Sequence, residues 1–444
     1  MRFRWGERVS SYAPGRVAIV GAGGHIGLPL SVVLAEAGFD VVGIDKNAEM
    51  NDRLVQGVVP YIEHGAEELL QRGLGRGNLR FTTEVDAMAS ADVLVIIVGT
   101  PVDDNLNPRI DPLINLLEAH APNIPDGQLI VLRSTVSPGT TDLLRKVLEQ
   151  RTGRSDGQGF HLVFAPERVL QTRAVEEIKA LPQLVGAFTR ASFERAQEFF
   201  GRFMESTCLR LTPVEAELGK LITNMTRYVS FALANEFYMI CDSYGANAHE
   251  IIAKANLDYP RLDLPRPGPN VGGPCLYKDG YYLTERIQYP DLIANAFKIN
   301  ESVPRYLLEQ VRQRATLNRV GVLGMTFKAN CDDIRNSLSF KLVKQVKGLH
   351  AEPVPVDPYL SEWADVSRLQ GVDALFLMTP HDEFRDLGKL LDVIDNPDCV
   401  IVDMWNFWTE YGSLAHNGIF TAREALPLRN AHLSAPAQAP APVN

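Results

Sequence analysis

Short apolar runs alternate with amphipathic segments along the first half of the chain. The runs are rich in Val, Ile and Leu and occupy residues 16–23, 40–46, 91–99, 128–135 and 161–167. Segments between them, such as 25–38 and 140–150, repeat apolar residues at helical spacing. Uninterrupted apolar strands separated by helices are typical of parallel sheets covered on both faces. The pattern therefore predicts a doubly wound α/β fold.

The pattern changes near Thr212. The sequence TPVE predicts a helix start, with Thr212 as the N-cap, Pro213 in the first helical position and Glu215 completing a capping box. Apolar residues then recur at helical spacing as far as Phe237, and Gly245 provides a stop. This predicts a helix of about 32 residues and about 48 Å. A helix this long and apolar is expected to join two domains and to pack against a second subunit in a homodimer.

Strand–helix alternation returns in the last third of the chain. Apolar runs occupy residues 319–327, 352–358, 372–380 and 399–406, which predicts a second, smaller Rossmann-like domain. The segments VAIVGAG and VGVLGMT both end a strand in a glycine turn, so a weak internal duplication is present. We therefore divide the chain into 1–211, 212–316, 317–430 and an Ala/Pro-rich segment, 431–444, that we expect to be disordered.

Charge and composition narrow the function. A formal charge of −10 over 444 residues argues against a non-specific nucleic-acid binder. No apolar run approaches the roughly 20 residues that span a bilayer, and the first residues lack the apolar core of a secretory signal. Five scattered cysteines without a CxxC pair indicate a reducing compartment and no metal site. We expect a cytoplasmic protein that binds neither nucleic acid nor membrane.

The first glycine turn, VGAGGHIGLPL, predicts a dinucleotide site. Such a turn brings glycine backbone close to a pyrophosphate at a helix N-terminus. Gly21 lies one residue before the strict first position, which Ala22 occupies. The expected cofactor contacts in the turn are Gly21, Gly24, His25, Ile26 and Gly27. Asp45 ends the next strand and is placed to accept from ribose hydroxyls, which favours NAD over NADP.

Polar residues also follow three later strands of the first domain. The carboxyl ends of parallel strands face the ligand crevice of an open sheet. Each residue alone could serve to cap a turn, but together they favour a site. The candidates for cofactor contact are Gly99, Thr100, Pro101, Ser134 and Thr135, and those for substrate contact are Glu167 and Arg168.

The stretch VGGPCLYKDG places a thiol, an amine and a carboxylate after two glycines. Cys275 could be a small buried apolar residue, the commoner role of a lone cysteine. However, Lys278 is close enough to favour the nucleophilic thiolate, and Asp279 could act as a base. A reactive thiol and a nicotinamide cofactor in one chain indicate chemistry at the aldehyde level. On the long helix, Lys220 and Asn224 share a face, although a solvated lysine is the usual outcome.

These motifs together resemble the UDP-glucose/GDP-mannose dehydrogenase family over nearly the full chain. The resemblance is carried by the glycine turn with GLPL and by VGTPVDDNLNP, STVSPGT, APER, AELGKLITN, GGPCLYKD and GMTFKANCDDIRNS. It implies two Rossmann-like domains joined by the long helix, the first binding NAD and the third segment binding a UDP-sugar. It also implies a four-electron oxidation of a sugar C6 alcohol to a uronic acid for polysaccharide precursor synthesis.

The resemblance also implies residue roles. Lys220 and Asp279 handle the proton of the alcohol through water, and Cys275 forms a thiohemiacetal that becomes a thioester. Thr135 and Glu167 match the family's threonine and hydrolytic glutamate. Further family positions in the substrate site are matched by Asn224, Gly272, Gly273, Lys278, Lys328 and Arg335.

Two features give opposite indications of the substrate. GGPC followed by Lys278 favours UDP-glucose, whereas the segment after Glu167 follows members that act on acetamido sugars, so UDP-glucose and a UDP-N-acetylhexosamine both remain open. Gln171 stands where some members carry a second carboxylate. The alternative functions are a two-electron hydroxyacid dehydrogenase of the phosphogluconate type, which needs no cysteine, and a nucleotide-sugar sensor without catalysis.

Overall fold

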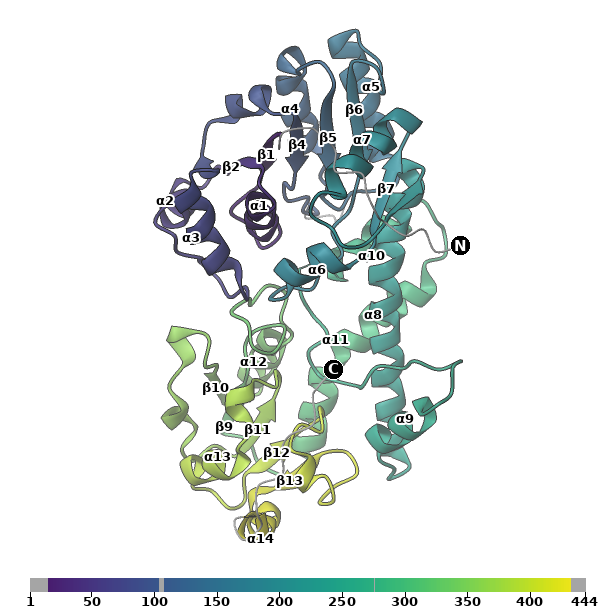
Figure 1. Ribbon diagram of the computed structural model, residues 1–444. Helices are drawn as coiled ribbons and strands as arrows, with labels where there is room; N and C mark the ends of the chain where they lie inside the picture. The colour runs from purple at the N-terminus through teal and green to yellow at the C-terminus, as the bar shows by residue number, and fades with distance from the viewer. Residues whose placement is uncertain (1–14, 104–107, 275, 433–444) are drawn as a thin grey trace. The chain divides into compact units, whose positions relative to one another are not determined.

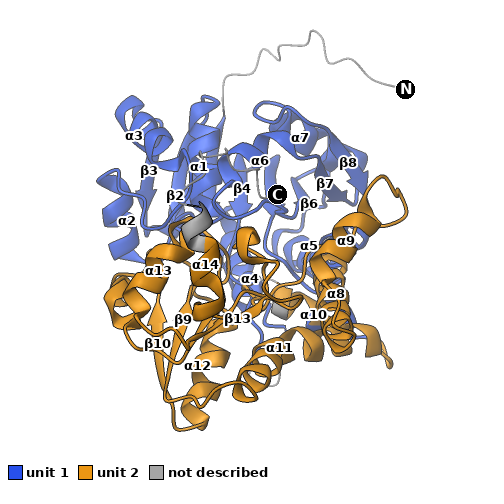
Figure 2. Ribbon diagram, turned by 90° about the horizontal axis from the view of Figure 1, so that it is seen from below, with its two compact units in different colours: residues 1–223, 281–286 blue, residues 224–280, 287–444 orange. Residues whose placement is uncertain are grey.

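The computed structural model describes residues 15–103, 108–274 and 276–432. The chain forms two compact units, which Figure 2 colours separately. Unit 1 comprises residues 1–223 and 281–286, and unit 2 comprises residues 224–280 and 287–444. Cys275 and nearly all of the tail predicted at 431–444 lie outside the described residues.

Unit 1 is built on a sheet that has eight strands in the described residues, in the order β3-β2-β1-β4-β5-β6-β7-β8. Neighbouring strands run parallel except for the antiparallel pair β6–β7. The strands are β1 (Arg16–Val20), β2 (Asp40–Ile44), β3 (Leu79–Thr82), β4 (Val93–Ile96), β5 (Gln128–Leu132), β6 (Phe160–Phe164), β7 (Gln183–Ala187) and β8 (Cys208–Leu211).

Both faces of this sheet are apolar. In β1, Val17 and Ile19 join one buried cluster, whereas Ala18 and Val20 join another. A sheet that is apolar on both faces must be covered by helices on both sides. The helices of this unit are α1 (Gly27–Glu36), α2 (Ala48–Val55), α3 (Ala66–Arg76), α4 (Asp111–His120), α5 (Thr140–Thr152), α6 (Ala174–Ala180) and α7 (Arg190–Phe200).

Unit 2 contains a second sheet, with five strands in the described residues and the order β10-β9-β11-β12-β13. Only β13 is antiparallel to its neighbour. The strands are β9 (Arg319–Leu323), β10 (Glu352–Val356), β11 (Ala374–Leu377), β12 (Val400–Val402) and β13 (Ile419–Thr421). The helices of this unit are α9 (Ala248–Asn256), α11 (Asp291–Arg312), α12 (Ser339–Gly348), α13 (Leu387–Ile394) and α14 (Ala422–His432). The two sheets confirm the predicted α/β class with two Rossmann-like domains.

A single long helix, α8 (Pro213–Ser243), runs from unit 1 into unit 2 (Figure 1). The Thr212 N–H donates to the Glu215 carboxylate at 2.8 Å, which is half of the predicted capping box. After the helix, Gly245 adopts a left-handed φ of +66°, which suits a glycine at a helix end. The long central helix is thus confirmed. A short helix, α10 (Leu276–Thr284), passes from unit 2 back into unit 1.

Within the described ranges, none of the helices is both long and apolar enough to cross a membrane.

Candidate active site

The glycine turn after β1 is shaped by close backbone contacts. Gly21 has a φ of +88°, and a Cβ there would lie 2.5 Å from the Ile97 carbonyl oxygen. A Cβ on Gly27, the first residue of α1, would lie 2.1 Å from the Gly21 oxygen. Gly24 is exposed, and its nearest neighbour would be at 3.6 Å. Gly21 and Gly27 therefore hold the turn against the strands, while Gly24 leaves room for a ligand.

Asp45 follows β2 and closes the same turn. Its Oδ2 accepts from the Gly23 N–H at 3.0 Å, and its Oδ1 accepts from the Asn47 N–H at 3.1 Å. The carboxylate is only half-buried, so each oxygen keeps lone-pair capacity for a further donor. The arrangement fits a dinucleotide, with its pyrophosphate at the N-terminus of α1 and a ribose hydroxyl at Asp45.

Three side chains from separate segments meet above the glycine turn. The rings of His25 and Tyr61 pack with centroids 4.0 Å apart, and the Tyr61 hydroxyl donates to the Gly24 carbonyl at 2.7 Å. Gln171 places its Nε2 3.1 Å from His25 Nδ1. Gln171 thus contacts the glycine turn. Ile26 precedes α1 and is half-buried.

The ends of β4 and β5 are joined by hydroxyl groups. The Thr100 hydroxyl donates to the Thr135 carbonyl at 2.5 Å, and the Ser134 hydroxyl donates to the Val98 carbonyl at 2.7 Å. The Tyr282 hydroxyl in turn donates to the Thr100 carbonyl. Gly99 and Pro101 are exposed beside Thr100, and Thr135 is half-buried. These strand ends form a rim next to the glycine turn, because Ile97, which directly follows β4, places its carbonyl oxygen against Gly21.

Glu167, at the end of β6, is held in a buried ion pair that the sequence analysis did not foresee. Its Oε2 contacts the guanidinium of Arg133, whose side chain is 3% exposed. Its Oε1 accepts from the N–H groups of Arg168 and Val169 at 2.8 and 3.2 Å. Burial lowers the pKa of the neighbouring Arg168 guanidinium, although the charge of Glu167 raises it. Glu167 is thus a carboxylate with a fixed orientation. Its partner, Arg133, is the first residue of the RSTV motif, so the sequence already placed an arginine at the end of the neighbouring strand.

Lys220 and Asn224 are one helical turn apart on α8. Both are buried, with 8% and 7% of their surfaces exposed. The usual outcome for a helical lysine, a solvated side chain, is wrong here because Lys220 is buried. Burial of an ammonium group is costly unless the group has an anionic or polar partner. The two residues therefore form a buried polar stretch of α8.

In unit 2, Asn224 faces a fully buried carboxylate. Its Nδ2 donates to Asp279 Oδ2 at 2.6 Å, and Asp279 is 0% exposed. The Lys278 ammonium lies 3.7 Å from Asp279 Oδ1, and that oxygen accepts no hydrogen bond from the described residues. A buried carboxylate oxygen with unused capacity is costly unless a ligand or water completes it. Asp279 is therefore poised to accept a proton or a hydrogen bond.

The residues before Cys275 are packed against a distant loop of unit 2. Cys275 itself lies outside the described residues. A Cβ on Gly272 would lie 2.3 Å from the Asn336 carbonyl oxygen, and Gly273, with a φ of +105°, lies against the Phe327 ring. The two glycines are thus required by the close approach of the loop 324–338. The structure brings together two motifs that are far apart in the sequence.

That loop connects β9 to α12 and carries both basic residues expected at a nucleotide diphosphate. Arg335 is half-exposed and pairs with Asp333 through Nε–Oδ1 at 2.9 Å and NH2–Oδ2 at 2.6 Å. Lys328 is also partly exposed, and its carbonyl accepts from the Thr326 hydroxyl at 2.9 Å. Lysine and arginine are the residue types that bind phosphate oxygens, so the loop keeps the side chains that the expectation requires. Across the described ranges, His, Cys, Asp and Glu side chains form no cluster able to bind a metal.

Models of three parts of one family match this chain. The NAD binding domain of the UDP-glucose/GDP-mannose dehydrogenase family matches residues 15–204, the central domain matches 214–302, and the UDP binding domain matches 321–410. Together these matches cover most of the chain.

Several known proteins are similar over most of their length. A UDP-N-acetyl-D-mannosamine dehydrogenase from Pyrococcus horikoshii is 32% identical, with 84% of this chain and 91% of that protein covered. An NDP-N-acetyl-D-galactosaminuronic acid dehydrogenase from Ralstonia nicotianae is also 32% identical, with 88% and 96% covered. The solved structure of the UDP-D-ManNAc dehydrogenase from P. horikoshii covers 85% of this chain and 93% of its own, with a TM-score of 0.80 at 32% identity.

Proposed function

Because the chain belongs to the UDP-glucose/GDP-mannose dehydrogenase family and is therefore an NAD-dependent oxidoreductase, we propose that it oxidises the C6 hydroxyl of a UDP-sugar to a carboxylate. The observation that carries this proposal is Asp279, a fully buried carboxylate four residues after Cys275 with one oxygen that accepts no hydrogen bond from the described residues. A four-electron oxidation through a thioester uses a base and a thiol, and the GGPCLYKD segment supplies both.

The cofactor site is formed by the turn after β1. Gly21, Gly24 and Gly27 let the backbone approach the pyrophosphate, with the N–H groups of His25 and Ile26 at the helix start. Asp45 accepts from the ribose hydroxyls, and a carboxylate there repels the 2′-phosphate of NADP. Gly99, Thr100, Pro101, Ser134 and Thr135 form the rim on the nicotinamide side. Bound NAD supplies the hydride acceptor for both oxidation steps.

The first oxidation removes a proton and a hydride from the C6 alcohol. Asp279, with its available Oδ1, accepts the hydroxyl proton through a water molecule. Lys220 stabilises the developing alkoxide, since a fixed cation in a water-poor site strengthens the interaction with negative charge. Asn224 orients Asp279 through its 2.6 Å hydrogen bond.

The second oxidation uses the thiol of Cys275. Its thiolate adds to the aldehyde carbon, and the resulting thiohemiacetal, in its alkoxide form, loses a hydride to give a thioester. Water then adds to the thioester carbonyl, the C–S bond breaks, and the thiol and the carboxylic acid are released. Asp279 removes the proton from the attacking water. We assign to Glu167, which forms a buried ion pair with Arg133, the role of the family's hydrolytic glutamate.

The UDP-sugar binds through Gly272, Gly273 and Lys278 near the thiol and through Lys328 and Arg335 at the diphosphate, with Arg168 as a further contact. We favour a UDP-N-acetylhexosamine over UDP-glucose, because the relatives described above act on acetamido sugars by name. The product is an activated uronic acid donor, which suits polysaccharide precursor synthesis. We retain the division at 211, 316 and 430 into cofactor-binding, central and UDP-binding parts, and place the enzyme in the cytoplasm, where its thiol stays reduced.

The decisive assay compares UDP-N-acetylmannosamine, UDP-N-acetylglucosamine, UDP-glucose and GDP-mannose while counting NADH per sugar consumed. Two NADH per sugar are expected. One NADH per sugar would instead indicate a two-electron dehydrogenase, and nucleotide-sugar binding without NADH would indicate a sensor. Cys275→Ser should abolish acid formation, and full turnover in this variant would refute the covalent step. Asp279→Asn should slow the first oxidation and stall hydrolysis, so that, when the variant is supplied with the C6 aldehyde of the nucleotide sugar and NAD, the thioester accumulates and is detectable by mass spectrometry.

We further propose a homodimer formed through α8 and a second copy of the chain. The exposed apolar residues of its second half, Leu233, Phe237 and Ile240, recur at spacings of four and three, and Tyr244, directly after the helix, follows at a spacing of four. This spacing forms one stripe of the kind that packs helix against helix. Light scattering after gel filtration should give twice the chain mass of 49.2 kDa, and Phe237→Glu should reduce it to the mass of one chain.

A further inference from the structure

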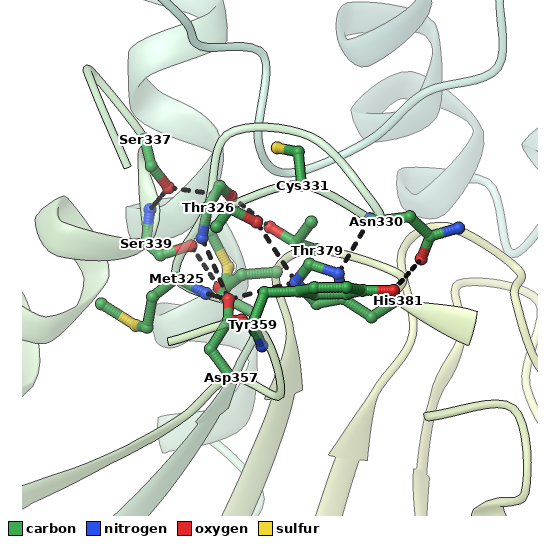
Figure 3. Close-up of polar contacts among 12 residues, drawn as sticks. Met325, Thr326, Asn330, Cys331, Ser337, Ser339, Asp357, Tyr359, Thr379 and His381 are labelled. Atoms are coloured by element: carbon green, nitrogen blue, oxygen red, sulfur yellow. Dashed lines mark hydrogen bonds and ion pairs between the residues drawn. The ribbon is translucent and has the colours of Figure 1, made fainter. Parts of the chain in front are cut away.

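The loop between β9 and α12, residues 324–338, has an internal polar network that the proposed reaction does not use. Figure 3 shows this network, with donors and acceptors from the loop and from the ends of β10 and β11. Its central members are Asp357, which follows β10, and His381, which follows β11. Both side chains are 0% exposed.

Asp357 holds the start of the loop. Its Oδ2 accepts from the N–H groups of Met325 and Thr326 at 2.7 and 3.2 Å, and its Oδ1 accepts from the Tyr359 N–H at 2.9 Å. Burial alone raises the pKa of Asp357, but hydrogen bonds from His381 and from the backbone outweigh it, so the pKa lies below its ordinary value. Asp357 is therefore an anion whose charge is used inside the fold.

The hydrogen bonds of His381 define its tautomer. Its Nδ1 accepts from the Asn330 N–H at 3.0 Å, so Nδ1 carries no proton. Nε2 therefore carries the proton and donates to Asp357 Oδ2 at 3.1 Å. The Thr326 hydroxyl lies 3.2 Å from the same Nε2. Because one nitrogen faces both the hydroxyl and the carboxylate, this arrangement cannot relay a proton as a catalytic triad does.

The imidazole is also held by its ring neighbours and by the turn it contacts. Tyr359 and Phe384 pack against it with ring centroids at 4.9 and 5.6 Å. Asn330 has a left-handed φ of +56°, and its side-chain oxygen accepts from the Asp382 N–H at 3.0 Å. The turn at Asn330 lies between Lys328 and Arg335. The turn therefore belongs to the segment that carries both cations.

We propose that His381 is a positioning residue for the nucleotide diphosphate. The neutral imidazole, oriented by Asp357, holds the turn at Asn330 through Nδ1, and this turn belongs to the segment that carries Lys328 and Arg335. This inference rests on the proposed function, because it assigns those two side chains to the diphosphate. His381 itself touches no substrate.

Two near-isosteric variants separate the two bonds of the ring. In His381→Asn the side-chain oxygen replaces Nδ1 and can accept from the Asn330 N–H, but no group reaches Asp357. In His381→Gln the terminal amide replaces the Nε2 donor, but the Asn330 N–H loses its acceptor. We expect His381→Gln to raise the Kd for UDP by about tenfold, the effect of one lost buried hydrogen bond, and His381→Asn to raise it by less than about threefold.

The readouts are titration calorimetry with UDP and steady-state kinetics on the full chain. We expect the KM for the nucleotide sugar to follow the Kd for UDP, while kcat and the KM for NAD stay within about twofold of wild type. Equal losses of UDP affinity in both variants, in proportion to their loss of thermal stability, would overturn the positioning role. Failure of the wild-type chain to bind UDP would refute the proposed function instead.

A measurement on the wild-type chain is independent of how the variants fold. In a ¹⁵N-histidine-labelled sample at neutral pH, the His381 resonances, assigned by their loss in His381→Asn or His381→Gln, should show a protonated Nε2 and an unprotonated, hydrogen-bonded Nδ1. A protonated Nδ1 would overturn the assignment of the Asn330 contact and with it the proposal.

Discussion

The first strand of each sheet along the chain, β1 and β9, leads into a glycine turn, and the two turns have the same geometry but different surroundings. Each is followed by a glycine with positive φ, +88° at Gly21 and +82° at Gly324. Each turn is held by an aspartate that follows the next strand: Asp45 accepts from Gly23, and Asp357 accepts from Met325. The aspartate in unit 1 is half-exposed, whereas its counterpart in unit 2 is fully buried.

This difference shows how one backbone device supports two kinds of binding. In unit 1 the turn leads directly into α1, so backbone N–H groups and the Asp45 carboxylate remain available to a ligand. In unit 2 the aspartate, Asp357, is covered by a longer loop and by His381 after β11. The charge of Asp357 is therefore satisfied inside the fold. In the proposed function, anion binding then passes to the side chains of Lys328 and Arg335. A carboxylate at the same position in the fold is thus a proposed ribose contact in one unit and a buried structural anchor in the other.

The largest effect is expected from removing the buried anchor. Asp357→Ala leaves His381 and two loop N–H groups without an acceptor, so we expect the free energy of unfolding to fall by about 3–5 kcal/mol. Asp45→Ala, at the equivalent position of unit 1, should lower it by only about 1 kcal/mol. Urea unfolding followed by circular dichroism measures both values. Equal losses in the two variants would remove the distinction between anchor and ligand contact.

A third strand-end aspartate extends the comparison to pH. Asp403 follows β12, and burial raises its pKa to about 6 although it accepts from the N–H groups of Phe407 and Trp408. The unfolded chain releases this proton near pH 4 and the folded chain near pH 6, so stability should fall as pH rises through that interval, by about 3 kcal/mol. Urea unfolding between pH 4 and 7 should show this slope, and Asp403→Asn should reduce it. The lowered pKa of Asp357 acts oppositely, since its contribution is lost only in stronger acid.

Asp45, the half-exposed aspartate of unit 1, should control cofactor choice with little effect on folding. Asp45→Asn removes a charged acceptor, so we expect the KM for NAD to rise about 10- to 100-fold. Activity with NADP should rise relative to NAD, because the repulsion of its 2′-phosphate is lost. The KM for the nucleotide sugar, measured in the same assays, serves as the control and should stay within about twofold. A change in that KM equal to the change for NAD would contradict the assignment.

The smallest effect is expected at the open glycine of the turn. Gly24→Ala places a methyl group at ordinary contact distance from its nearest neighbour, so the melting temperature should hardly change. The KM for NAD should nevertheless rise about three- to tenfold, because the methyl group occupies the approach of the pyrophosphate. Gly27→Ala is the contrasting variant, since its Cβ would lie 2.1 Å from a backbone oxygen and should destabilise the whole turn. A loss of stability in Gly24→Ala would show that this position is structural.

Much of the fold was predictable because it depends on local pattern. Apolar runs revealed five of the eight strands described in unit 1 and four of the five in unit 2, but not β3, β7, β8 or β13. The capping residues Thr212 and Glu215 located the start of α8. Asp45 was predicted because it lies at a characteristic distance from a recognisable glycine turn. Asp357 stands in the corresponding place in the weak internal duplication, yet its role depends on His381, which lies on a later strand end. Burial created by a distant residue has no signature in the local sequence.

The site was predictable in its residue types but not in its pairings. Cys275, Lys278 and Asp279 were noticed as neighbours in the sequence, whereas the bond from Asn224 to Asp279 joins two helices. Arg133 was visible at a strand end, but its burial against Glu167 depends on the adjacent strand. Such pairings are set by how elements pack, and a single sequence gives no direct measure of that packing.

The close packing of Gly272 and Gly273 against Asn336 and Phe327 has a consequence for engineering. In a chimera that takes only the cysteine segment from a relative, the backbone of that segment would have to pack against the loop 324–338 of this chain, to which it is not matched. The two segments should therefore be exchanged together, as one interlocked module, when sugar preference is transferred between members. In natural sequences they are expected to co-vary for the same reason.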